Sequence, residues 1–166
     1  MKYSDVNDII GENISMYSKH LDKAIDLMTK TEEIAYAKNV KLIELRNYQI
    51  KCLYDFAEYN LSIPKIKFGD KSIVDRANIL NSALFQYYIK ANILYCGSAI
   101  SSYLKLIREW TRDENKYAIK DNIFNNGVLY GMKIKCLPNS IIPRDEFIYV
   151  DKETDEIIKY KIEGVN

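Results

Sequence analysis

The chain contains 166 residues, of which 48% are apolar and 28% charged, and its formal net charge is +1. This length and apolar content predict one domain with a buried core, while the balanced charge excludes an overall field that would draw the protein onto nucleic acid or an anionic membrane. No apolar stretch reaches the roughly 18 to 20 residues of a membrane span, and no basic start precedes an apolar run. We therefore expect a soluble, cytoplasmic protein without a membrane partner.

Three cysteines and one histidine limit the metal and covalent chemistry that the sequence suggests. Cys52, Cys96 and Cys136 are odd in number and widely spaced, which indicates reduced core thiols rather than a disulfide framework. No cysteine pair has the spacing of a zinc site, and we interpret His20 as a surface residue. The sequence predicts neither a metal site nor a cofactor.

The N-terminal residues predict a short helix over about 4–10. Ser4 or Asp5 can cap its first turn, and Gly11 can end it in the left-handed conformation. A helix that continues through Gly11, at a cost of about 1 kcal/mol, is the alternative.

Residues 13–61 predict one long helix, because residues 16–60 contain no proline or glycine and apolar residues recur at steps of seven. Apart from Gln49, this column is apolar and consists of Ile14, Leu21, Met28, Ala35, Leu42 and Phe56. Polar residues near Thr31 interrupt the stripe, where the helix either turns them to solvent or bends. A rod of this length, about 70 Å, needs a partner along its whole length.

A loop over residues 62–71 leads to a second long predicted helix over 71–115. Asp70 or Ser72 can cap its start, and small residues from Gly97 onward permit close approach of another backbone or a kink. Two long helices joined by a short loop should lie antiparallel.

After a turn cluster at 121–127, the apolar period changes from helical to two, which indicates β-strands. The predicted strands cover residues 128–136, 147–150 and 157–162. The fold class is therefore α+β and mainly α: a long antiparallel helical hairpin with a short N-terminal helix and a C-terminal three-stranded antiparallel β meander. Residues 1–120 form the helical region, and 121–166 form the meander as part of the same domain.

Seven residues are candidates for interaction with a partner: Tyr87, Tyr88, Tyr95, Tyr103, Lys133, Lys135 and Arg144. Tyrosine is common in interfaces, yet it also fills cores with its hydroxyl at the margin, and both readings stay open. The lysines form a basic strand face that could meet nucleic acid, although lysine more often blunts a sheet edge. Arg144, in a loop, can grip a carboxylate or phosphate, against the simpler reading of an exposed polar loop.

The carboxylates form no recognisable catalytic pattern. The adjacent Glu32 and Glu33 point about 100° apart in a helix. The segment 151–155 resembles the start of a calcium loop but lacks the required glycine and final glutamate, so we interpret it as a hairpin turn. An enzyme whose acids converge only in the fold, such as Glu32, Asp145 and Glu146, is a third hypothesis.

The long helices, the tyrosines and the lack of a catalytic pattern predict a non-catalytic, homo-oligomeric assembly or structural protein. Abundant lysine, isoleucine, asparagine and tyrosine indicate an AT-rich genome, so the hypothesis takes the form of a phage or mobile-element virion component, located in the host cytoplasm or the virion. The alternative is a small binding protein that inhibits a host enzyme or defence complex, or sequesters a nucleotide. The expected partners are the chain itself and other proteins; nucleic acid is not favoured.

Overall fold

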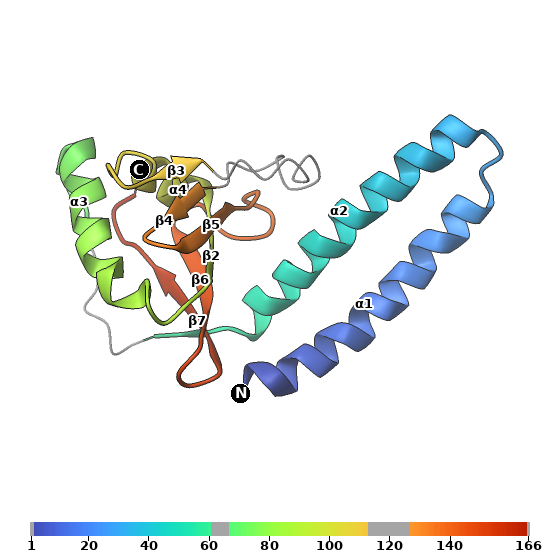
Figure 1. The fold of residues 1–166 in the computed structure, drawn as a ribbon, viewed down its shortest axis with the longest axis horizontal. Helices are drawn as coiled ribbons and strands as arrows, with labels where there is room; N and C mark the ends of the chain where they lie inside the picture. Colours follow the sequence, from blue (N-terminus) through green and yellow to red (C-terminus); the bar gives the residue numbers. More distant parts are fainter. Residues whose placement is uncertain (1, 61–66, 113–126, 166) are drawn as a thin grey trace.

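The computed structural model describes residues 2–60, 67–112 and 127–165. Its helices are α1 (Tyr3–Asp26), α2 (Thr31–Phe56), α3 (Ile73–Leu84) and α4 (Ser98–Leu104), with a short 3-10 helix η1 (Phe85–Tyr87). Its strands are β1 (Glu58–Tyr59), β2 (Ile93–Cys96), β3 (Thr111–Arg112), β4 (Gly127–Leu129), β5 (Met132–Cys136), β6 (Glu146–Asp151) and β7 (Glu156–Lys161). Figure 1 shows a body that contains the sheet and an arm formed by α1 and α2. The α+β class predicted from the sequence is correct.

The strands form one seven-stranded mixed sheet in the order β1-β7-β6-β2-β5-β4-β3. The inner strand β2 runs parallel to β5 and antiparallel to β6, and β1 runs parallel to β7. Successive side chains of a strand point to opposite faces. Phe147 and Tyr149 of β6 therefore pack with α3 and α4, while Ile148 packs with the beginning of α1 and the end of α2.

Both faces of the sheet are covered, but by different parts of the chain. On one face the core contains Leu80 and Leu84 of α3 and Leu104 of α4. On the other face it contains Val6 of α1 and Leu53 of α2. We call the parts of α1 and α2 that pack on the sheet the roots of the arm. Among the described residues, no helix combines the length and the apolar character that crossing a membrane requires.

The three-stranded meander predicted from the sequence is wrong. The central strand β2 and the short edge strands β1 and β3 come from residues within the predicted helices 13–61 and 71–115, and β2 separates β5 from β6. The predicted strand 128–136 is a hairpin, because Tyr130 and Gly131 adopt positive φ angles of 50° and 81° and reverse the chain. The two last strands lie close to their predicted positions, around a polar turn.

The helix predicted over 71–115 is also wrong. α3 begins after Ser72, whose hydroxyl accepts a hydrogen bond from the Asp75 N–H, but it ends at Leu84. The four residues of β2 follow after η1 and are buried or half-buried in succession. A short continuous apolar run has no periodicity that distinguishes a central strand from a buried helix. Its pairing with β5 and β6 therefore decides that this segment is a strand.

The first two helices have bounds that differ from the predicted 4–10 and 13–61. α1 continues through Gly11 and ends at Asp26, and the chain turns back before Thr31 begins α2. The antiparallel hairpin is therefore formed by α1 and α2. The second long helix that was predicted as its partner is replaced by α3, which ends at Leu84. The predicted helix ends at 61 and 115, part of the 62–71 loop and most of the 121–127 turn cluster lie outside the described residues.

Replacing Gly11 by alanine should stabilise the protein. Gly11 lies inside α1, and a Cβ built there meets no atom within 4 Å. Alanine removes the entropic cost of a helical glycine without steric conflict, so we expect the free energy of unfolding to rise by about 0.5–1 kcal/mol. Chemical denaturation of the two proteins measures the difference; an unchanged or lower midpoint would contradict a continuous α1.

The same substitution at Gly97 should be strongly destabilising. A Cβ at Gly97 would lie 2.0 Å from the Pro143 carbonyl oxygen and 2.5 Å from the Arg144 Cα. Both atoms belong to the backbone, and no side-chain rotation relieves the contact, so we expect a loss of about 2–3 kcal/mol or more. A Gly97→Ala protein with the denaturation midpoint of the original chain would show that the β2–α4 corner is not packed as described.

Candidate functional site

The outer part of the arm contains no buried side chain. In α1 the buried residues are Val6 and Ile10, and in α2 they are Ile50, Cys52 and Leu53. Residues 11–26 therefore extend for about 24 Å beyond the last buried position of α1. Among the residues that the structure describes, each helix has only the other helix to pack against in this region (Figure 1).

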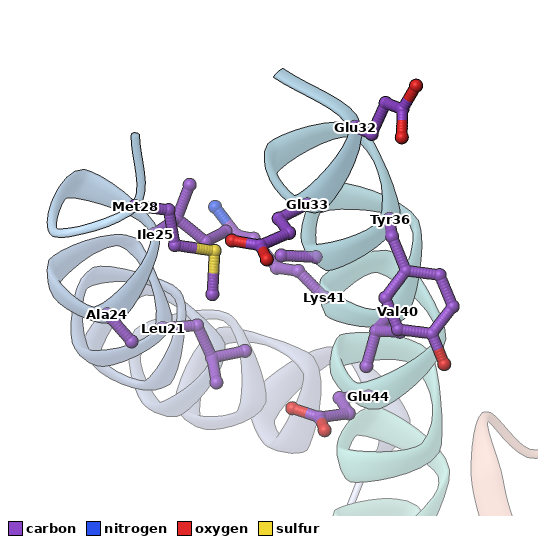
Figure 2. A pocket seen from close by; sticks show the side chains of 11 residues that line it. Leu21, Ala24, Ile25, Met28, Glu32, Glu33, Tyr36, Val40, Lys41 and Glu44 are labelled. Atoms are coloured by element: carbon purple, nitrogen blue, oxygen red, sulfur yellow. The ribbon is translucent and has the colours of Figure 1, made fainter. Parts of the chain in front are cut away.

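A groove of about 540 Å³ lies between the two helices on this outer part. Figure 2 shows side chains around it from both sides, with Leu21 of α1 and Met28, just after α1, extending toward the space between the helices and Glu33 of α2 extending toward them. Its lining consists of Leu21, Ala24, Ile25, Met28, Glu32, Glu33, Tyr36, Ala37, Val40, Lys41 and Glu44. We call this feature the arm groove. Its walls are mainly apolar, which is the character of a protein-binding groove.

The charges around the arm groove are mostly negative. Glu32, Glu33 and Glu44 all belong to α2. The only lysine in the lining, Lys41, forms an ion pair with Asp22 of α1 that joins the two helices. The arm groove is thus an apolar channel with an acidic rim on its α2 side.

Large apolar side chains are also exposed elsewhere on the arm. Tyr36, at the rim of the arm groove, is 73% exposed, and Met16 of α1 and Leu27, just after α1, are 72% and 85% exposed. Near the root, the rings of Tyr17 and Tyr48 lie 4.8 Å apart and close the space between the helices. The arm therefore carries more apolar surface than its own two helices cover.

A buried carboxylate fixes the end of α2 to the sheet. Glu146 of β6 is 4% exposed and accepts hydrogen bonds from the hydroxyls of Tyr54 (2.8 Å) and Tyr59 (2.5 Å). The Lys159 Nζ lies 4.4 Å and 4.6 Å from the centres of the same two rings. Both carboxylate oxygens are used and a cation lies nearby, so this cluster satisfies a buried charge and positions the arm.

The start of α1 is fixed to the turn between β6 and β7. The Ser4 hydroxyl donates to the Asp155 Oδ2 at 2.8 Å, and the Lys2 Nζ donates to the Thr154 carbonyl at 2.7 Å. Asp155 has a φ of 56°, which turns its carboxylate toward the first turn of α1. Both roots of the arm are therefore held by one β-hairpin.

The four candidate tyrosines lie in the body rather than on the arm. Tyr87 and Tyr88 are buried, and Tyr95 is half-buried on the face that the roots cover. Tyr103 is half-buried, with its ring 5.1 Å from Phe68. In this structure their rings contribute to the core and its margin.

The basic candidates do not form one open face. Lys133 is exposed and Lys135 half-buried on β5, and Lys159 packs on the tyrosine rings at the arm root. β5 and β7 are separated by β2 and β6 in the sheet. Arg144 is exposed before β6, where its carbonyl oxygen accepts from the Ala99 N–H at 3.0 Å.

A small aromatic patch on the body is the second exposed apolar surface. Phe85 is 64% exposed and Tyr130 is 42% exposed, and their ring centres are 6.1 Å apart. Both rings contact Tyr88, and Ile89 beside them is 82% exposed. This patch lies on the body, whereas the arm groove lies on the outer part of the arm.

Three groups that could support chemistry, the thiols of Cys96 and Cys136 and the carboxylate of Asp151, have structural surroundings. Burial raises the pKa of the Cys96 and Cys136 thiols, which keeps them protonated and weakly nucleophilic. The Asp151 Oδ1 accepts from the Glu153 N–H at 2.8 Å within the predicted hairpin turn. Within residues 2–60, 67–112 and 127–165, no three His, Cys, Asp or Glu side chains gather as metal ligands.

The sequence predicted that two arm-groove residues are part of an apolar stripe, but it did not predict that they line an open groove. Leu21 and Met28 stand in the predicted apolar column, which we assigned to contact with a second long helix. The sequence did leave a bend open near Thr31, and the acids Glu32 and Glu33 that follow it favour the first turn of a new helix. A break at that point gives the arm its tip.

Buried tyrosines should make the protein unstable at alkaline pH. Burial is the largest cause that raises the pKa of Tyr54, Tyr87, Tyr88, Tyr95 and Tyr149 above the ordinary value of 10. The folded state keeps these hydroxyls protonated while the unfolded chain releases the protons, so stability is complete below pH 10 and falls as the pH rises above it. Denaturation from about pH 8 to about pH 11 measures this; a constant free energy of unfolding would contradict it.

Comparisons with protein-family models, with curated proteins and with solved structures gave no match for this chain. The function must therefore be inferred from the geometry of the arm and the body.

Proposed function

We propose that this protein is a non-catalytic, homo-oligomeric assembly protein whose arm joins one chain to another. One observation carries the proposal: the outer part of the arm has no buried side chain, yet it presents an open apolar groove. Monomeric proteins seldom expose contiguous apolar surface without a use for it.

The energetics of a two-helix arm support this role. Helices in proteins gain most of their stability from packing of an apolar face, and within the described part of the chain each arm helix has one neighbour over its outer part. Covering apolar surface contributes about 25 cal/mol per Å² removed from water. A further chain in the arm groove would supply the contact that the body, which lies at the roots, does not provide.

The biological setting is part of the same proposal. The amino-acid usage indicates an AT-rich genome, and a structural protein that assembles through a helical arm suits a phage or mobile-element particle. Detection of the chain in purified particles by mass spectrometry would support a virion component, and its absence would restrict the proposal to assemblies inside the host cell.

The alternative proposal is a small protein that inhibits a host enzyme or defence complex, or sequesters a nucleotide. In that case the protein contacts another molecule and not a second copy of itself. Solution mass separates the two. A monomer that keeps its mass over a tenfold concentration range would contradict self-assembly and favour the alternative.

A paired substitution tests the arm groove directly. Ala24→Glu with Tyr36→Glu places two charges in the groove lining, and both positions are exposed, so the fold should survive. Burying two unpaired charges in a contact should raise the apparent Kd of the oligomer at least ~100-fold. Light scattering after size-exclusion chromatography, with a concentration series, measures the change.

Ala35→Glu with Leu42→Glu is the matched control. It changes the same number of exposed apolar side chains on the arm and adds the same charge, but neither residue lines the arm groove. We expect the control to assemble like the original chain. Equal loss of assembly in both variants would mean that general charge, and not the arm groove, determines association.

A further inference from the structure

We infer that the arm groove receives α1 of a second copy, so that two arms cross antiparallel about a two-fold axis and form a four-helix bundle. This inference rests on the proposed function and names the occupant of the arm groove. Three observations support it: the position of the apolar residues on α1, the charges on α1 and α2, and the presence of the exposed apolar line and the arm groove on the same arm.

The apolar surface of α1 is wider than one neighbour needs. Leu21 and Met28 line the arm groove. Met16 of α1 and Leu27, the C-cap residue that follows the helix, are eleven residues apart, about three helical turns, and form a separate exposed line. The spacing places Ala24 between the two lines, where a small side chain lets another helix approach closely. A helix with one apolar face toward its own α2 and a second beyond it is suited to pack with more than one helix.

Charge selects α1 as the occupant. Between Met16 and Leu27, α1 carries the exposed basic residues Lys19 and Lys23, one helical turn apart; of the two acids in the same stretch, Asp22 is paired with Lys41 and Asp26 is exposed. The rim of the arm groove carries Glu44 and Glu33 on α2, and Glu33 lies 3.8 Å from the Lys30 Nζ. When α1 of one copy lies in the groove of the other, its lysines face the partner's glutamates at the edge of an apolar contact.

The two-fold axis follows from having both surfaces on one arm. Because the exposed line of α1 lies beside the arm groove, a single antiparallel contact places each α1 in the partner's groove at once, and the contact is closed. A head-to-tail contact would fill one groove and leave another open at each end. In the closed arrangement α1 has neighbours on both of its apolar lines, while α2 stays on the outside, where Lys38 and Asn39 are exposed.

Charge reversal on opposite sides of the contact tests this geometry. Variant one is Lys19→Glu with Lys23→Glu, and variant two is Glu33→Lys with Glu44→Lys. Each variant alone places like charges against each other twice in the dimer, so its apparent Kd should rise about tenfold or more at low salt. An equimolar mixture should form a mixed dimer with nearly the original Kd, because both contacts are then complementary. Sedimentation velocity with one variant labelled measures this.

Controls keep the interpretation clear. Lys38→Glu with Lys71→Glu reverses the same number of exposed lysines outside the arm groove, and it should dimerise like the original chain and gain nothing from mixing with variant two. Circular dichroism checks that every variant is folded. A chain with all four substitutions of variants one and two should also dimerise, since it restores complementary charges within its own homodimer.

The outcomes separate this inference from the proposed function. Recovery in the mixture supports α1 in the partner's groove. An original chain that assembles, with charge variants that have no effect or do not recover on mixing, overturns the two-fold bundle and leaves the assembly proposal standing. An original chain that is monomeric at every concentration overturns both.

Discussion

The attachment of the arm to a single β-hairpin is the constraint on which the rest of the structure depends. At the end of α2, the buried Glu146 of β6 accepts hydrogen bonds from Tyr54 and Tyr59. At the start of α1, the turn between β6 and β7 offers Asp155 to Ser4. Polar groups that are buried with their partners fix geometry more strictly than apolar packing does, because a displaced donor leaves an unpaired charge. The two roots are therefore held at a set separation, and α1 and α2 run outward side by side.

The contrast between body and arm explains why the arm is the surface of interest. In the body, both sheet faces are covered, by α3 and α4 on one side and by the roots on the other. No second layer from residues 2–60, 67–112 or 127–165 covers the outer arm. Two helices alone bury one seam between them, and a globular domain normally closes its apolar faces with two or more packed layers. The open groove is the direct result of that missing layer.

The sequence left two explanations for the abundance of tyrosine open, an interface and a core margin, and the structure places different tyrosines in different roles. Tyr87, Tyr149 and Tyr160 belong to the main core, where Tyr149 is fully buried. Tyr54 and Tyr59 serve the carboxylate at the arm root. Tyr36, by contrast, is largely exposed at the rim of the arm groove. Residue type alone did not separate these roles, because a phenol ring suits a core margin, a buried polar cluster and an interface equally well.

The sequence by itself determined the helical character of most of residues 3–56, a helix start capped by Asp70 or Ser72, and the period-two pattern that places β6 and β7 around a polar turn. These are local features, set by spacing, capping and turn residues. Only the tertiary structure decided that Ile93 to Cys96 is a central strand, since a four-residue apolar run takes its conformation from the strands beside it. It also decided that the long helical segment folds back near Met28, and that Leu21 and Met28 of its apolar stripe line an open groove between α1 and α2 rather than packing on a second long helix. Sequence periodicity reports which residues avoid water, but the identity of the surface that covers them is a property of the whole chain and of its partners.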